Sequence, residues 1–177
     1  MNYTPQPRLP GPWKELQGRL AGSFTARSRG FLGDEFIFSN TDGEELGRLI
    51  MWGLRGAKLT AGALEAVVER AAGSRYAMLT GGEEVLRAHP FGASANGLEI
   101  ECGDRAYTAT VGLLRNVAAA RNRAGDETVR LAGNITGRGY RADIDVEDGC
   151  ALPVAVLLLY HTASLRRRAY RAAVGRR

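Results

Sequence analysis

The sequence has few of the residues that build catalytic and metal centres. Only two cysteines, Cys102 and Cys150, and two histidines, His89 and His161, occur in 177 residues. Two widely separated cysteines form neither a disulfide framework nor a zinc motif. Two histidines leave little material for a catalytic triad or a histidine-built metal site. We therefore expect no enzymatic activity and no cofactor.

A secretory signal is also missing. The first twelve residues read MNYTPQPRLPGP and contain no apolar segment of the kind that signal peptides require. Four of the six prolines fall in this stretch, which is typical of extended chain. We therefore expect residues 1–17 to form a flexible, proline-rich leader. Together with the unpaired cysteines, this favours a cytoplasmic protein.

Basic charge is scarce outside the C-terminus. The formal net charge is +5, but residues 166–177 contain six arginines and no acid. Without those six arginines, 18 basic and 19 acidic residues remain, so the rest of the chain is close to neutral. Nucleic-acid binding normally needs many phosphate contacts, so no nucleic-acid partner is expected.

Short apolar segments separated by turn residues dominate residues 20–146. Several alternate cleanly: Tyr140, Ala142 and Ile144 share one strand face, which indicates strands with one buried side. Turns such as Thr41-Asp42-Gly43 recur at the spacing of antiparallel meanders. Residues 63–72 and 113–123 also have a composition that suits short helices, and we favour strands there. The twelve predicted strands are Leu20–Ser28, Glu35–Ser39, Leu46–Trp52, Ala57–Ala61, Leu64–Ala71, Arg75–Thr80, Glu84–Ala88, Gly97–Cys102, Arg105–Val111, Leu114–Ala120, Thr128–Ala132 and Arg138–Val146.

The last element is predicted to be a hydrophobic helix over residues 153–170. Seven consecutive apolar or aromatic residues, Val154 to Tyr160, leave no polar stripe, so the helix must be surrounded by protein or by lipid. The uncharged window Gly149–Leu165 has 17 residues and spans about 25 Å, which is short of the roughly 30 Å hydrocarbon core. This favours burial in protein, with a tail-anchored membrane protein as the alternative. We predict a mainly β fold over residues 18–170: a closed antiparallel barrel of about twelve strands around the central C-terminal helix, followed by a basic tail at 171–177.

This order of elements resembles a known family. The segments that carry the resemblance are Phe36–Gly43 with Leu46–Ile50, then Val129–Gly133 and Tyr140–Ile144, and finally Pro153–Tyr160. The chain is similar to the tubby-like C-terminal fold of tubby proteins, phospholipid scramblases and LURP-one-related proteins, and is closest in size to the last group. The resemblance implies a barrel threaded by an apolar helix. It also implies association with membrane lipid, although the basic headgroup residues of tubby proteins have no counterparts that can be matched here.

The C-terminal arginines are the candidate lipid-binding residues. An anionic membrane surface attracts nearby basic side chains by about 1 kcal/mol each. The alternative is a solvated helix end, where cations are favoured by the helix dipole. An anionic lipid surface, reached peripherally at the inner membrane, or a protein is therefore the expected partner. The candidate lipid-binding residues are Arg166, Arg167, Arg168, Tyr170 and Arg171.

An acidic segment just before the helix suggests a weaker calcium hypothesis. The segment begins at Asp143 and does not follow the EF-hand pattern. Counted from Asp143, the sixth residue is an aspartate rather than the required glycine, and the twelfth is Val154 rather than glutamate. The alternative is an outward strand face followed by a turn. The candidate metal ligands are Asp143, Asp145, Glu147 and Asp148.

These observations favour a non-enzymatic tubby-like binding module that associates with anionic membrane lipid. Two alternatives remain at this point. The first is a protein-interaction scaffold with no lipid role, and the second is the tail-anchored membrane protein.

Overall fold

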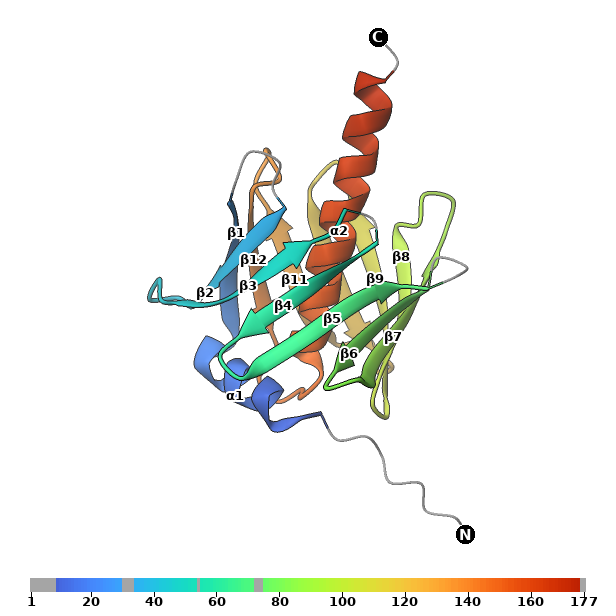
Figure 1. Ribbon diagram of the computed structural model, residues 1–177. Helices are drawn as coiled ribbons and strands as arrows, with labels where there is room; N and C mark the ends of the chain where they lie inside the picture. Colours follow the sequence, from blue (N-terminus) through green and yellow to red (C-terminus); the bar gives the residue numbers. More distant parts are fainter. Residues whose placement is uncertain (1–8, 30–33, 54, 72–74, 176–177) are drawn as a thin grey trace.

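The computed structural model describes residues 9–29, 34–53, 55–71 and 75–175. Its elements form one antiparallel barrel with a helix at each end of the chain (Figure 1). In chain order they are α1 (Gly11–Leu20), β1 (Ser23–Arg29), β2 (Glu35–Ser39), β3 (Glu45–Met51), β4 (Gly56–Ala61), β5 (Leu64–Arg70), β6 (Tyr76–Thr80), β7 (Glu83–Phe91), β8 (Gly97–Cys102), β9 (Arg105–Gly112), β10 (Val117–Asn122), β11 (Glu127–Gly133), β12 (Gly139–Ile144) and α2 (Ala151–Val174).

Every strand pairs with its neighbours in the sequence, and β1 closes the barrel by pairing with β12. The closing register places Phe24 opposite Ala142 and Ala26 opposite Tyr140. Because the strands alternate in direction, the six connections that follow odd-numbered strands lie at one end of the barrel. We call this the exit end, because α2 leaves the barrel there. The other end, which α1 covers, is the capped end (Figure 1).

The barrel encloses α2 on all sides. Every residue from Ala151 to Leu165 is buried, as the absence of a polar stripe requires. A helix with its side chains is about 10–12 Å across, so the wall must leave room for it. Small inward side chains supply that room on several strands, including Ala57, Ala66, Ala109 and Ala142, all at most 1% exposed. The closed barrel around a C-terminal helix is therefore confirmed.

Each of the twelve predicted segments overlaps one observed strand. The two ambiguous stretches form β5 and β10. In both, buried residues alternate with partly buried or exposed ones, as in Leu64, Glu65 and Ala66. A strand face buried inside the barrel therefore decides the structure there, against the helical preference of alanine and leucine.

The N-terminal prediction is corrected in part. Residues 1–8 lie outside the described segments, but α1 occupies 11–20, where a flexible leader was expected to continue to residue 17. Trp13, Leu16 and Leu20 recur at helical spacing and are buried against the capped end. Trp13 Nε1 donates to Thr80 Oγ1 at 3.0 Å, and Gln17 Nε2 donates to the Asp148 carbonyl at 2.9 Å.

The C-terminal helix is longer than predicted. It begins at Ala151 rather than at residue 153 and continues to Val174, so that residues 171–174 of the expected basic tail are helical. Its last turns project beyond the barrel, as the red end of α2 shows (Figure 1).

Candidate functional site

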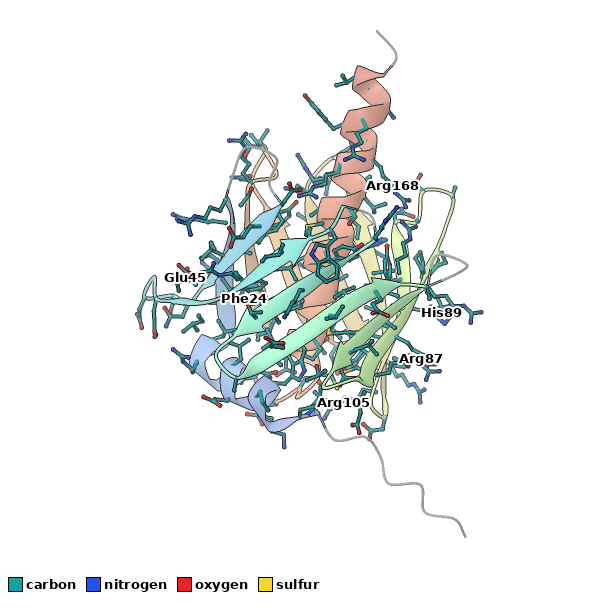
Figure 2. The ribbon with its side chains drawn as sticks, viewed as in Figure 1. Phe24, Glu45, Arg87, His89, Arg105 and Arg168 are labelled. Carbon is teal, nitrogen blue, oxygen red and sulfur yellow. The ribbon has the colours of Figure 1, made fainter. Side chains whose placement is uncertain are left out.

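The C-terminal arginines lie where α2 leaves the barrel. Arg166 Nη2 donates to the carbonyl of Ile135 at 2.9 Å, and Arg167 Nη1 pairs with Asp34 Oδ1 at 3.0 Å. Arg168 is half-buried at the rim of the barrel (Figure 2), while Tyr170 and Arg171 are exposed on the projecting turns. The five candidate lipid-binding residues therefore share the exit end, but two of them also fasten α2 to the hairpins around it.

Glycine permits one of these contacts. A Cβ atom at Gly137 would lie 2.6 Å from Arg166 Nε, and the backbone there has a φ of +69°, which other residues rarely adopt. A side chain at position 137 would therefore displace the guanidinium of Arg166 and would also need an unfavourable backbone conformation.

Further arginines surround the helix at the exit end. In the described connections there, one acid, Asp34, accompanies four exposed arginines. Coulomb attraction from this group extends over about a Debye length, 8–10 Å at ordinary salt. Arginine is also the side chain best shaped to form paired hydrogen bonds with phosphate. The four are Arg55, Arg75, Arg115 and Arg138.

The capped end has the opposite charge. Its described connections contain one arginine, Arg123, and seven acids. Helix α1 adds Lys14 and Arg19 but also Glu15. The near-neutral body predicted from composition is therefore separated into a basic end and an acidic end. The seven acids are Asp42, Glu44, Asp104, Asp126, Asp145, Glu147 and Asp148.

Inside the exit end, His161 of α2 is fully hydrogen-bonded. Its Nε2 lies 2.7 Å from the Ala95 carbonyl, and its Nδ1 lies 2.8 Å from the Tyr76 hydroxyl. Because a carbonyl only accepts, Nε2 carries the proton and Nδ1 accepts from Tyr76. The guanidinium of Arg70 lies 5.8 Å from the centre of the Tyr76 ring. His161 is thus a core residue that joins the helix to two hairpins.

Burial lowers the pKa of His161 to about 4, and the hydrogen bond to Ala95 only partly offsets this. The unfolded chain, with an ordinary histidine pKa near 6.5, binds the proton more tightly than the native protein does. The contribution of His161 to stability is therefore complete above pH 6.5. About 3 kcal/mol of the free energy of unfolding is lost as the pH falls toward 4.

Chemical denaturation at a series of pH values from 7 to 4.5 measures this loss of stability. We expect His161→Gln, which cannot bind this proton, to show a shallower decline, and an equally steep decline would refute the assignment.

A second buried polar group closes the capped end. Asp148, which is 2% exposed, accepts from the Tyr107 hydroxyl at 2.8 and 2.9 Å and from the Cys150 backbone N–H at 2.9 Å. Arg105 Nη1 pairs with it at 2.9 Å. The Cys150 thiol donates to the Cys102 carbonyl at 3.2 Å. These contacts anchor the β8–β9 hairpin to the start of α2.

The four candidate metal ligands do not converge. Asp148 points inward to this network, whereas Asp143 pairs with Arg141 on the outer face and Asp145 accepts from the backbone N–H of Glu147. Within the residues that the structure describes, no three His, Cys, Asp or Glu side chains gather to hold a metal ion. The calcium hypothesis is therefore not supported by this geometry.

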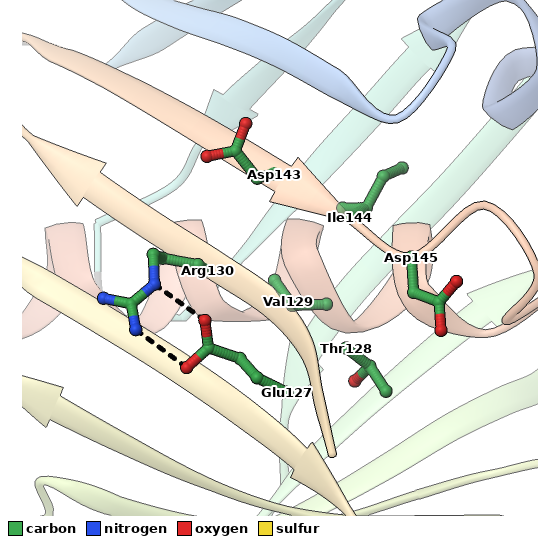
Figure 3. Close-up of a pocket in the computed structure, with 7 residues that line it drawn as sticks. All are labelled: Glu127, Thr128, Val129, Arg130, Asp143, Ile144 and Asp145. Carbon is green, nitrogen blue, oxygen red and sulfur yellow. Dashed lines mark hydrogen bonds and ion pairs between the residues drawn. The ribbon is translucent and has the colours of Figure 1, made fainter.

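A hollow on the outer wall between β11 and β12 is lined by Asp143 and Asp145 (Figure 3). Arg130 lies in the same hollow and forms two bonds with Glu127, at 2.7 and 2.9 Å. Figure 3 shows this pair, with Asp143 and Asp145 set apart from it. Arg130 and Glu127 thus pair with each other within this polar hollow.

The apolar part of α2 lies inside the barrel, whereas the tail-anchored alternative would require this part of the helix to lie in lipid. Among the described helices, neither has both the length and the hydropathy needed to cross a membrane.

No protein-family model matches this sequence, and no curated protein does. A solved crystal structure of an Arabidopsis thaliana protein of the LURP-one-related group is similar to it, with a TM-score of 0.55 and 12% sequence identity. The similarity covers 78% of this chain and 90% of the plant protein. Identity this low shows a shared fold and nothing about activity. The twelve-stranded barrel and this neighbour fit the tubby-like fold.

Proposed function

We propose that this protein is a non-enzymatic binding module of the LURP-one-related kind, which attaches to anionic membrane lipid through the exit end of its barrel. The observation that carries the proposal is the separation of charge along the barrel axis. Arginines gather around the projecting end of α2, while acids dominate the described connections at the opposite end. An anionic surface therefore attracts one end and repels the other, which orients the molecule.

Arginines on the projecting turns are best placed to meet phosphate first. Arg171 is exposed, and Arg168 lies at the rim of the barrel. Neither forms an ion pair with an acid among the described residues. Tyr170, which is 72% exposed between them, has the amphipathic ring found at membrane–water interfaces.

Vesicle sedimentation tests the proposal. The protein is expected to sediment with vesicles that contain phosphatidylserine and to stay in the supernatant with pure phosphatidylcholine. The double variant Arg168→Gln with Arg171→Gln should weaken binding by about tenfold or more, since each basic residue contributes about 1 kcal/mol.

The matched control removes two charges from the other end, with Lys14→Gln and Arg123→Gln. Its net charge equals that of the test variant, so simple attraction by net charge predicts equal loss in both. The proposal predicts near-normal binding for the control. Equal sedimentation with neutral and anionic vesicles, or none with either, would contradict it.

A further inference from the structure

Large apolar side chains are exposed mainly at the exit end. Among the described residues, Val146 is the one exposed large apolar side chain in a connection of the capped end. Ile50 lies on β3, one residue before the end of that strand. The others lie at the exit end, at strand ends, in hairpin connections or on the projecting turns of α2: Trp52, Phe91, Leu114, Ile135, Tyr170 and Val174.

Two of these side chains are almost fully exposed. Leu114 is 105% exposed and Ile135 is 96% exposed, so each is as accessible as in an extended peptide. They occupy the connections of β9–β10 and β11–β12, which are adjacent hairpins because β10 pairs with β11. Turns of this kind normally hold polar residues and glycine. Neither aliphatic side chain contributes to the folded core, so their exposure needs another explanation.

The two tips lie side by side at the exit end and both carry arginine, and Asn116 Nδ2 of one connection donates to the Asn134 carbonyl of the other at 2.7 Å. Arg115 follows Leu114 directly, and Arg138 lies in the same connection as Ile135. Arg166 of α2 donates to the Ile135 carbonyl, which holds that hairpin against the helix. Figure 1 shows the orange β11–β12 hairpin rising at the exit end, on the same side of α2 as the yellow β9–β10 hairpin. The two tips and the helix therefore occupy one side of the exit end, where a tilted molecule brings all three to a flat surface.

We propose that Leu114 and Ile135 are apolar anchors that enter the outer hydrocarbon layer of a bilayer while the neighbouring arginines contact lipid phosphates. This inference rests on the proposed membrane function and adds the depth and orientation of binding. An apolar tip flanked by cations matches the layered chemistry of an anionic membrane, in which phosphate lies directly above the acyl chains. Purely electrostatic attachment would disappear at high salt, whereas anchored attachment keeps a salt-resistant part.

Tryptophan reporters test insertion directly. The chain has two tryptophans. Trp13 is buried at the capped end, and Trp52, at the exit end, is replaced by phenylalanine to give the background protein. Leu114→Trp and Ile135→Trp are then mixed with phosphatidylserine vesicles that contain lipids brominated on the acyl chains. The matched control is Val146→Trp, a position that is 57% exposed at the capped end.

We expect blue-shifted, bromine-quenched emission from both tip reporters and unchanged emission from the Val146→Trp control. If the background protein sediments with the vesicles but neither tip is quenched, insertion is wrong and surface attachment stands. If it does not sediment, both proposals fail.

Polar substitution gives a second measurement that does not depend on the reporters. Leu114→Ser with Ile135→Ser leaves the charge unchanged and alters two fully exposed positions, so the fold is expected to be preserved. The salt-resistant part of vesicle binding should fall by about tenfold or more. Unaltered salt-resistant binding would overturn the proposal. If the protein dimerises in analytical ultracentrifugation and the double serine variant does not, the tips are a contact between two copies of the chain. That result would also overturn the proposal.

Discussion

Replacing Leu158 with alanine is expected to lower the free energy of unfolding by about 2–5 kcal/mol. Leu158 lies near the middle of the buried part of α2 and is 0% exposed. Strands surround the helix, and a closed sheet has little freedom to move inward, so the cavity should remain largely unfilled. Denaturant titration followed by circular dichroism measures the change.

The matched control is Leu114→Ala, the same substitution at a fully exposed hairpin tip. Its free energy of unfolding should stay within about 0.5 kcal/mol of the parent value. Similar losses in the two variants would mean that α2 is not enclosed as described.

Asp148→Ala is expected to cost about 2–6 kcal/mol, because two buried donors each lose a hydrogen bond, at about 1–3 kcal/mol each. The substitution removes the acceptor for the Tyr107 hydroxyl and the Cys150 backbone N–H, and the partner of Arg105. Of these, the tyrosine hydroxyl and the N–H are buried and lose their hydrogen bonds without gaining water. Thermal and denaturant unfolding of the purified variant measure the loss.

Asp143→Ala is the control for charge alone. Asp143 lies near Asp148 in the sequence, but its side chain is 53% exposed and its ion pair with Arg141 is on the surface. Exposed pairs of this kind contribute about 0–1 kcal/mol. If the two variants are equally stable, Asp148 does not organise the capped end.

The fold could be predicted from the sequence because two patterns agree. Strands such as β12 alternate in polarity, and the seven-residue apolar segment Val154–Tyr160 has no polar side. A helix of that kind needs a wall all round it, and a closed barrel is the wall that short alternating strands can build. Helix α1 was missed because prolines precede it and its apolar stripe is only three residues long: Trp13, Leu16 and Leu20.

The arginines of the hairpins were missed for a different reason. Arg55, Arg75, Arg115 and Arg138 are dispersed in the sequence, and the near-zero total charge of the body, with 18 basic and 19 acidic residues, hides them. Their grouping appears once alternate connections are assigned to opposite ends of the barrel. Arg166 and Arg167 were identified as candidates, but their contacts with Ile135 and Asp34 join residues far apart in the chain, which no local pattern reveals.

Amide hydrogen exchange along α2 tests the central claim most directly, because the barrel shields part of this helix and leaves the rest exposed. The amides of residues 155–165 are expected to be among the slowest in the protein and to exchange only on global unfolding, while those of residues 169–174 exchange orders of magnitude faster. Fast exchange throughout the helix, with slow exchange retained in the strands, would show that the barrel does not enclose α2.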